Sequence, residues 1–178
     1  MLSGMGILLS HPAFELSSIE FQGQSMDGLE EMQMAASIEK DNIFLINLNR
    51  IEHNVRELDR VRICRARRVL PSSVQIQVAE HTPSLLVNFD NIVGLSEDGH
   101  FVPVLQDGSI ADLPILTGLD KVVTVEEYKK TEEPVALLAL KFLNDLGTIN
   151  PELKDLISEI RYDSNGFVVL LRDRSLPV

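Results

Sequence analysis

Apolar and polar residues alternate most regularly between residues 73 and 80. Val74, Ile76 and Val78 alternate there with Gln75, Gln77 and Ala79, which predicts a strand with one buried and one solvated face. A strand-like run from residue 61 to residue 69 precedes it, and a Pro-Ser-Ser turn separates the two runs. The pattern therefore predicts a β-hairpin whose second strand buries Val74, Ile76 and Val78.

Three further elements are expected before this hairpin. Residues 14–22 form a strand-like run that ends at a glycine, and residues 29–38 carry apolar side chains at helical spacing. Asn47 is suited to cap a second helix, which the apolar residues from Leu48 to Leu58 predict at steps of three and four. The predicted order up to residue 80 is therefore β-α-α-β-β.

After residue 83, the signals are mostly those of strands. Asp98-Gly99 and Asn165-Gly166 are dipeptides that favour tight hairpin turns. An apolar stripe that begins at Pro134 predicts one long helix ended by Gly147. The sequence thus predicts an α+β protein, in which a mixed, mostly antiparallel β domain with flanking helices follows the first module. The expected strands lie at 85–89, 92–95, 101–105, 157–162 and 167–171.

The charge of the chain limits what it can bind. Sixteen basic and 27 acidic residues give a formal net charge of −11, which argues against general affinity for nucleic acid or for an anionic membrane surface. One run is basic and contains Arg60, Arg62, Arg65, Arg67 and Arg68. It has no interleaved aromatic residues for base stacking, so a solvated strand face that meets acidic groups is the favoured interpretation.

The sequence shows no pattern of catalytic or metal-binding residues. The four histidines are scattered without metal-ligand spacing, and there is no phosphate-binding loop or nucleophile motif. Glu80 and His81 are neighbours, and strand neighbours point to opposite faces, so they are not expected to act on one substrate. Cys64 is the single cysteine and is expected to be a small buried residue. We therefore expect no enzyme, no cofactor and no metal site.

The hairpin resembles that of the FtsQ/DivIB family of bacterial cell-division proteins, whose pattern is V-x-x-A-x-V-x-R-x-x-P-x-x-L-x-I-x-V-x-E-R-x-P. The segment from Leu113 to Gly118 likewise resembles the L-P-x-L-x-G segment of that family. At three positions the residue differs from the pattern: Cys64, Ala66 and His81 replace a small residue, a larger aliphatic residue and an arginine. The residues that match in type are Val61, Arg68, Pro71, Val74, Ile76, Val78, Glu80 and Pro83.

This resemblance implies a domain organisation. The order β-α-α-β-β is that of the POTRA domain, which is expected over residues 13–82. A β domain is expected over residues 83–178, incomplete at its C-terminal end, and residues 1–12 are expected to be a remnant or linker.

The resemblance also implies a function, that of a non-enzymatic divisome scaffold at the division septum. Its implied partners are division proteins of the FtsL and FtsB/DivIC type, with no nucleic acid. One N-terminal helix, absent here, would anchor the parent protein in the inner membrane as a single-pass protein, with this region in the periplasm or otherwise outside the membrane. Partner contacts are expected at Arg65, Arg67, Arg68, Glu80 and His81.

Two other functions stay open. One is a POTRA-containing component of outer-membrane protein secretion or assembly, although such proteins usually continue into further POTRA units or a long barrel. The other is a cytosolic regulatory or nucleic-acid-binding protein, for which the arginine-rich strand would have to be the binding surface.

Overall fold

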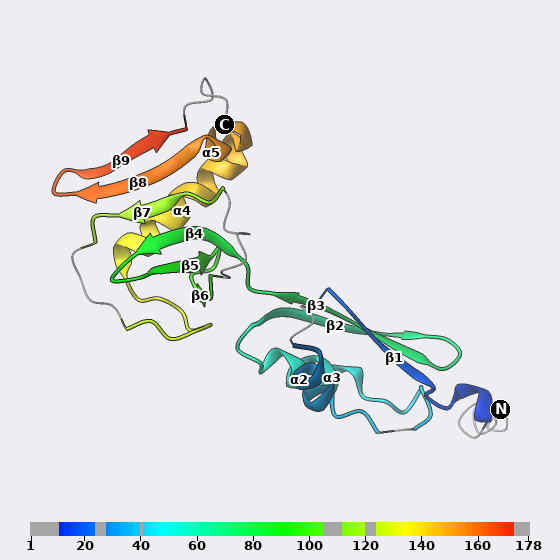
Figure 1. The fold of residues 1–178 in the computed structure, drawn as a ribbon. Helices are drawn as coiled ribbons and strands as arrows, with labels where there is room; N and C mark the ends of the chain where they lie inside the picture. Colours follow the sequence, from blue (N-terminus) through cyan, green and yellow to red (C-terminus); the bar gives the residue numbers. More distant parts are fainter. Residues whose placement is uncertain (1–10, 24–27, 40, 105–111, 120–123, 173–178) are drawn as a thin grey trace. The chain divides into compact units, whose positions relative to one another are not determined.

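The chain divides into two compact units, and the division falls between Glu80 and His81. Each unit has its own sheet and its own hydrophobic core (Figure 1), and the predicted α+β class is confirmed. The structure is a computed structural model that describes residues 11–23, 28–39, 41–104, 112–119 and 124–172.

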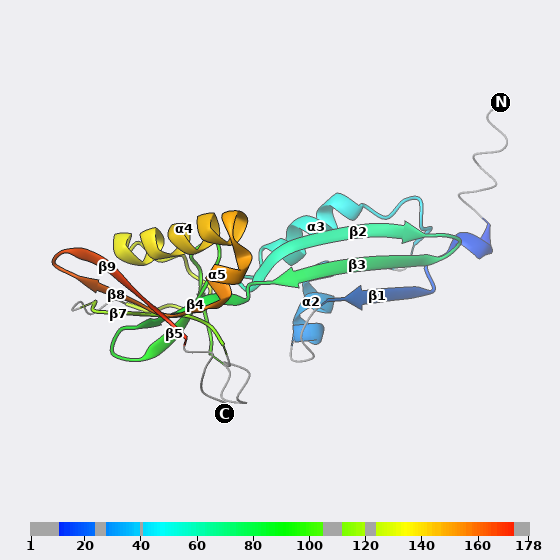
Figure 2. The same ribbon diagram turned by 90° about the horizontal axis from the view of Figure 1, so that it is seen from above.

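The first unit has the predicted element order β-α-α-β-β after a short 3-10 helix, η1. Its sheet has the order β1-β3-β2, with β1 parallel and β2 antiparallel to the central β3 (Figure 2). Both helices lie on the same face of this sheet (Figure 1). The elements are η1 (Pro12–Phe14), β1 (Ser18–Gln22), α2 (Leu29–Ala36), α3 (Leu48–Arg56), β2 (Val61–Val69) and β3 (Ser73–Glu80).

The predicted alternation of the hairpin is confirmed in the core of the first unit. Val74, Ile76 and Val78 are buried on the face that the helices cover. Val61 and Cys64 are both buried although they are three residues apart, because the register between β2 and β3 shifts between Val61 and Ile63.

Asn47 begins α3 as predicted. Its side chain accepts a hydrogen bond from the backbone N–H of Arg50 at 3.1 Å and so satisfies one donor of the first helical turn. The amphipathic residues of α3 then place Ile51 and Val55 in the core.

The second unit is a mixed sheet of the order β6-β5-β4-β7-β8-β9. The pairings β4–β7 and β7–β8 are parallel, and the other three are antiparallel. The elements are β4 (Pro83–Asn88), β5 (Ile92–Ser96), β6 (Phe101–Val102), β7 (Ile115–Thr117), α4 (Pro134–Ile149), α5 (Pro151–Asp155), β8 (Ile157–Asp163) and β9 (Gly166–Leu171).

Helix α4 covers one face of this sheet (Figure 2) and buries Ala139, Leu140 and Leu143 against it. The predicted end at Gly147 is wrong, because the helix continues to Ile149. Pro151 explains the later end: the residue before a proline avoids the helical region, and Asn150 accordingly has φ −149° and ψ 88°.

The Leu113–Gly118 segment contributes the short strand β7 and then turns. Gly118 has φ +84°, and a Cβ atom at this position would lie 2.1 Å from the carbonyl oxygen of Tyr162 on β8. Glycine is therefore required here both for the backbone conformation and for the close approach of the two strands.

Candidate partner-binding surface and histidine cluster

The arginines of β2 lie on two faces of the strand. Arg65 and Arg67 are opposite Gln77 and Gln75 in the register, on the face away from the helices. Arg68 lies on the helix side, where its Nε donates to the carbonyl of Ile43 at 2.7 Å and its Nη2 to that of Ile46 at 2.6 Å. Arg68 therefore fixes the loop before α3 to the sheet and does not share a surface with Arg65 and Arg67.

The open face of the sheet carries the exposed side chains of Arg65 and Arg67. Arg67 donates from Nε to Oε1 of Gln75 at 2.5 Å, which buries Gln75 although it lies on the solvated face. A groove of about 510 Å³ follows the strand, and most of its charged side chains are basic. The charged residues that line it are Glu52, Arg56, Arg62, Arg65 and Arg67.

The outer edge of β2 is partly occupied by a side chain of its own unit. The backbone N–H of Ala66 donates to Oε1 of Glu52 on α3 at 2.7 Å. A carboxylate in this position takes a hydrogen-bond donor that an added strand would otherwise use.

Cys64 is the buried residue that the alternation predicted. Burial and the nearby negative charge of Glu52 raise the pKa of its thiol to about 11, although Arg56 acts in the opposite direction. A thiol in this state is not a nucleophile near neutral pH, so the groove has no reactive cysteine in it.

Arg60 and Glu80 are held together within the first unit. Nε of Arg60 lies 3.8 Å from Oε1 of Glu80, and its Nη2 lies 3.3 Å from Oε2 of Glu31. The Arg60 side chain is only 16% exposed, so it is not part of the solvated basic face that the sequence suggested. Gly28 leaves the space for it, since a Cβ there would lie 1.5 Å from the Arg60 guanidinium.

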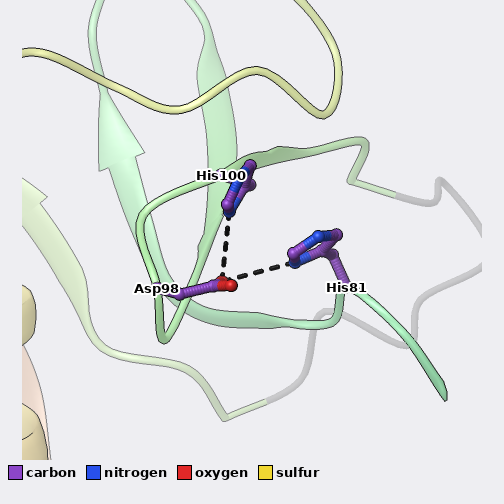
Figure 3. A group of neighbouring side chains, drawn as sticks. All are labelled: His81, Asp98 and His100. Atoms are coloured by element: carbon purple, nitrogen blue, oxygen red, sulfur yellow. Dashed lines mark ion pairs between the residues drawn. The ribbon is translucent and has the colours of Figure 1, made fainter. Parts of the chain in front are cut away.

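His81 belongs to the second unit, where it lies beside Asp98 and His100 (Figure 3). Each histidine places Nδ1 at 3.3 Å from Oδ1 of Asp98, and the two ring centroids are 4.3 Å apart. The view of the histidines as scattered residues is therefore wrong for this pair. Sequence spacing missed the cluster because 16 residues, including the whole β4–β5 hairpin, lie between His81 and Asp98.

The carboxyl group of Asp98 is held ionised. Burial alone would raise its pKa, but polar contacts from Ser96 and His100 and the charge of His81 outweigh burial and lower the pKa to about 2. Its strongest contact is from the hydroxyl of Ser96, which donates to Oδ1 at 2.7 Å. The cluster thus presents one carboxylate and two imidazoles, which is a set of groups that can hold a cation.

Among the described residues, β9 forms one edge of the second sheet, and this edge is apolar. Strand β9 exposes Val168, Val169, Leu170 and Leu171, whose exposed fractions range from 36% to 53%. Val168 lies opposite Arg161, and Leu170 lies opposite Glu159, on the solvated face of the sheet. Val169 lies opposite Ile160 on the other face. An apolar edge strand of this kind is a typical place for strand addition by a partner.

The first unit matches a known domain family. The family model described as "POTRA domain, FtsQ-type" matches residues 14–81. The POTRA domain that the resemblance implied is therefore confirmed by this match, as is the α+β architecture in which a mixed sheet follows it.

Full-length relatives agree with this match and extend it into the second unit. The chain is 25% identical over 163 residues to Cell division protein FtsQ of Myxococcus fulvus, and 26% identical over 165 residues to that of Syntrophotalea carbinolica. These alignments cover 91% and 92% of the chain but only 57% and 58% of the relatives. The resemblance to the FtsQ/DivIB family of cell-division proteins is confirmed. The chain spans less than three fifths of the length of these relatives.

Within the described residues, no helix combines the length and the apolar character that crossing a membrane would require.

Proposed function

We propose that this chain is the extracytoplasmic region of a membrane-anchored division protein of the FtsQ type, which assembles other septal proteins and catalyses no reaction. The observation that carries the proposal is the FtsQ-type POTRA domain together with relatives named for cell division along nine tenths of the chain. The same match makes a secretion-type POTRA protein the weaker candidate, because the matching model is the FtsQ type.

The proposed partners are extracytoplasmic segments of FtsL-type and FtsB/DivIC-type proteins. Two features of the molecule favour binding to extended protein segments. The first is the basic groove along the β2 edge, and the second is the apolar edge of β9. Backbone pairing at such edges supplies affinity, and side chains beside the edge supply specificity.

Among the residues that the sequence suggested, we propose Arg65 and Arg67 as direct contacts to an acidic partner segment. Both are exposed, and they lie on one face beside the groove. Arg68, Glu80 and His81 are proposed to act indirectly, because their side chains contact Ile43, Arg60 and Asp98 within their own units. Arg68, Glu80 and His81 would thus hold the neighbouring strand ends in place.

The test is a titration of the chain against a labelled extracytoplasmic segment of the FtsB-type protein from the same genome. The double variant Arg65→Glu/Arg67→Glu is expected to weaken binding by at least about tenfold at low salt, and by less at high salt, since exposed charges are screened. Arg50→Glu, an exposed arginine on α3, is the matched control and should leave the affinity unchanged.

Two results would count against the proposal, and they are distinguishable. An equal loss of affinity in Arg50→Glu and in the double variant would show that the effect is not specific to the β2 face, which would then not be the contact. Failure of the unsubstituted chain to bind the FtsB-type or FtsL-type segments would remove the partner assignment itself.

A further inference from the structure

The cluster of His81, Asp98 and His100 has the geometry of a metal site (Figure 3). Each histidine directs Nδ1 toward the Asp98 carboxylate, and the ligand atoms of the three residues all lie within 4.8 Å of one another. Both Nδ1–Oδ1 separations are 3.3 Å. His81 is 8% exposed, so one imidazole comes from a buried position.

The two separations between the histidines and Asp98 fit a four-coordinate ion. Zn²⁺ binds histidine nitrogen at about 2.0–2.1 Å and carboxylate oxygen at about 2.0–2.2 Å, in tetrahedral geometry. Two ligands of a tetrahedral site at these distances are separated by roughly 3.3–3.4 Å. Both separations from Asp98 already have this value, so an ion needs little movement of the carboxylate relative to either ring.

We propose that Nδ1 of His81, Nδ1 of His100 and Oδ1 of Asp98 form a binding site for a divalent transition-metal ion of the Zn²⁺ class. Two imidazoles and one carboxylate suit Zn²⁺ better than Mg²⁺ or Ca²⁺, which prefer oxygen ligands. The side chain of Asp98 is 43% exposed, which leaves the fourth position open to water.

The turn between β5 and β6 prepares two of the three ligands. Ser96 is 2% exposed; its hydroxyl donates to Oδ1 of Asp98 at 2.7 Å and accepts from the backbone N–H of His100 at 3.0 Å. The N–H of Gly99 donates to the carbonyl of Ser96 at 2.9 Å, and Gly99 has φ +87°. Hydrogen bonds of this kind orient metal ligands before the ion arrives.

An ion bound by all three residues would hold the β5–β6 turn next to His81 and so stabilise the start of β4. His81 comes two residues before Pro83, whereas Asp98 and His100 lie beyond the end of β5. The ion would therefore cross-link the two ends of the β4–β5 hairpin. Binding to the folded state alone raises stability with metal concentration, which gives a readout that needs no partner protein.

The experiment titrates the intact chain with Zn²⁺ by calorimetry at neutral pH, and with Co²⁺ by visible absorption. We expect one ion per chain, a cobalt spectrum of four-coordinate type, and a higher thermal midpoint with Zn²⁺ that a chelator reverses. Asp98→Asn and His100→Gln are each expected to weaken binding at least about tenfold. Their thermal midpoints without metal check that both variants remain folded.

The matched control is His53→Gln. His53 is exposed on α3, and its Nδ1 lies 3.8 Å from Glu57, so it is a histidine beside a carboxylate outside the cluster. This variant should bind Zn²⁺ as the unsubstituted chain does. No stoichiometric binding by the unsubstituted chain, or the same weakening in His53→Gln as in His100→Gln, would overturn the assignment. If Asp98→Asn fails to fold, His100→Gln decides the question.

Discussion

The two units present edge strands of opposite character. Strand β2 of the first unit carries exposed arginines, and the carboxylate of Glu52 accepts from its Ala66 N–H. Strand β9 of the second unit exposes four consecutive apolar residues, Val168 to Leu171. Charged side chains discourage unwanted strand pairing, whereas an apolar edge favours it. The difference is that strand addition at β2 would require a partner of matching charge, whereas burial of β9 would itself be favourable.

The largest effect is expected from a charge in the core beneath the β2 edge. Ile76 is fully buried, so Ile76→Asp should unfold the first unit, because an unpaired buried carboxylate costs several kcal/mol, about as much as a small domain's whole stability. Amide hydrogen exchange measures this unit by unit, and the α4 amides of the second unit should stay protected. Gln77→Asp, on the opposite face, is the control. An equal loss of amide protection in Ile76→Asp and Gln77→Asp would mean that the two faces of β3 are not distinct.

The next effect concerns pH and the buried thiol of β2. The pKa of Cys64 is raised from 9.0 to about 11 in the folded state. The unfolded chain therefore loses this proton first, and the free energy of unfolding should fall as the pH rises from about 9 toward about 11. Urea titrations across this range measure the slope. Cys64→Ala should remove that part of the slope, and an unchanged slope in this variant would contradict the assignment.

A smaller effect is expected at the edge hydrogen bond. Glu52→Ala removes the acceptor for the Ala66 N–H and should lower the free energy of unfolding by about 1 kcal/mol. Glu57→Ala, an exposed residue just after α3, should change it by less than about 0.5 kcal/mol. If partners add to β2, Glu52→Ala should also bind them faster, because the edge is then open. Stability equal to that of Glu57→Ala would show that Glu52 does not protect the edge.

The smallest effect on stability is expected at β9. Leu170→Lys places a charge on the solvated face beside Glu159, so stability should change by no more than about 0.5 kcal/mol. Self-association at high concentration should nevertheless decrease, as sedimentation velocity can measure. Leu138→Lys, which replaces an exposed leucine on α4, is the control for hydrophobicity alone. If Leu138→Lys decreases self-association as much as Leu170→Lys does, the β9 edge has no special role in self-association.

The fold was predictable where the signal is local. Alternation located β2 and β3, Asn47 located the start of α3, and Asp98-Gly99 located the turn before β6. The parallel placement of β7 between β4 and β8 was not predictable in this way. A three-residue strand has no periodicity of its own, and only its partners far along the chain determine its position.

The candidate site was predictable only in part. Period-two alternation already implies that Arg68 and Arg67 lie on opposite faces, but the density of arginines suggested one patch. The burial of Arg60 depends on Glu31 and on the space at Gly28, which come from a different element. The histidine cluster depends on the β4–β5 hairpin, so no short spacing in the sequence contains it.

The parallel pairing of β1 with β3 has a consequence for how the first unit assembles. Strands β2 and β3 are joined by a short turn and can pair within microseconds, as isolated hairpins do. Strand β1 must instead close a loop in which Ser17 meets Ser72, 55 residues away, before any of its contacts form. We expect β1 to join the sheet after the hairpin and to leave it first when the native state opens locally. The first unit would then transiently expose the edge of β3, and this exposure of its central strand follows from its topology.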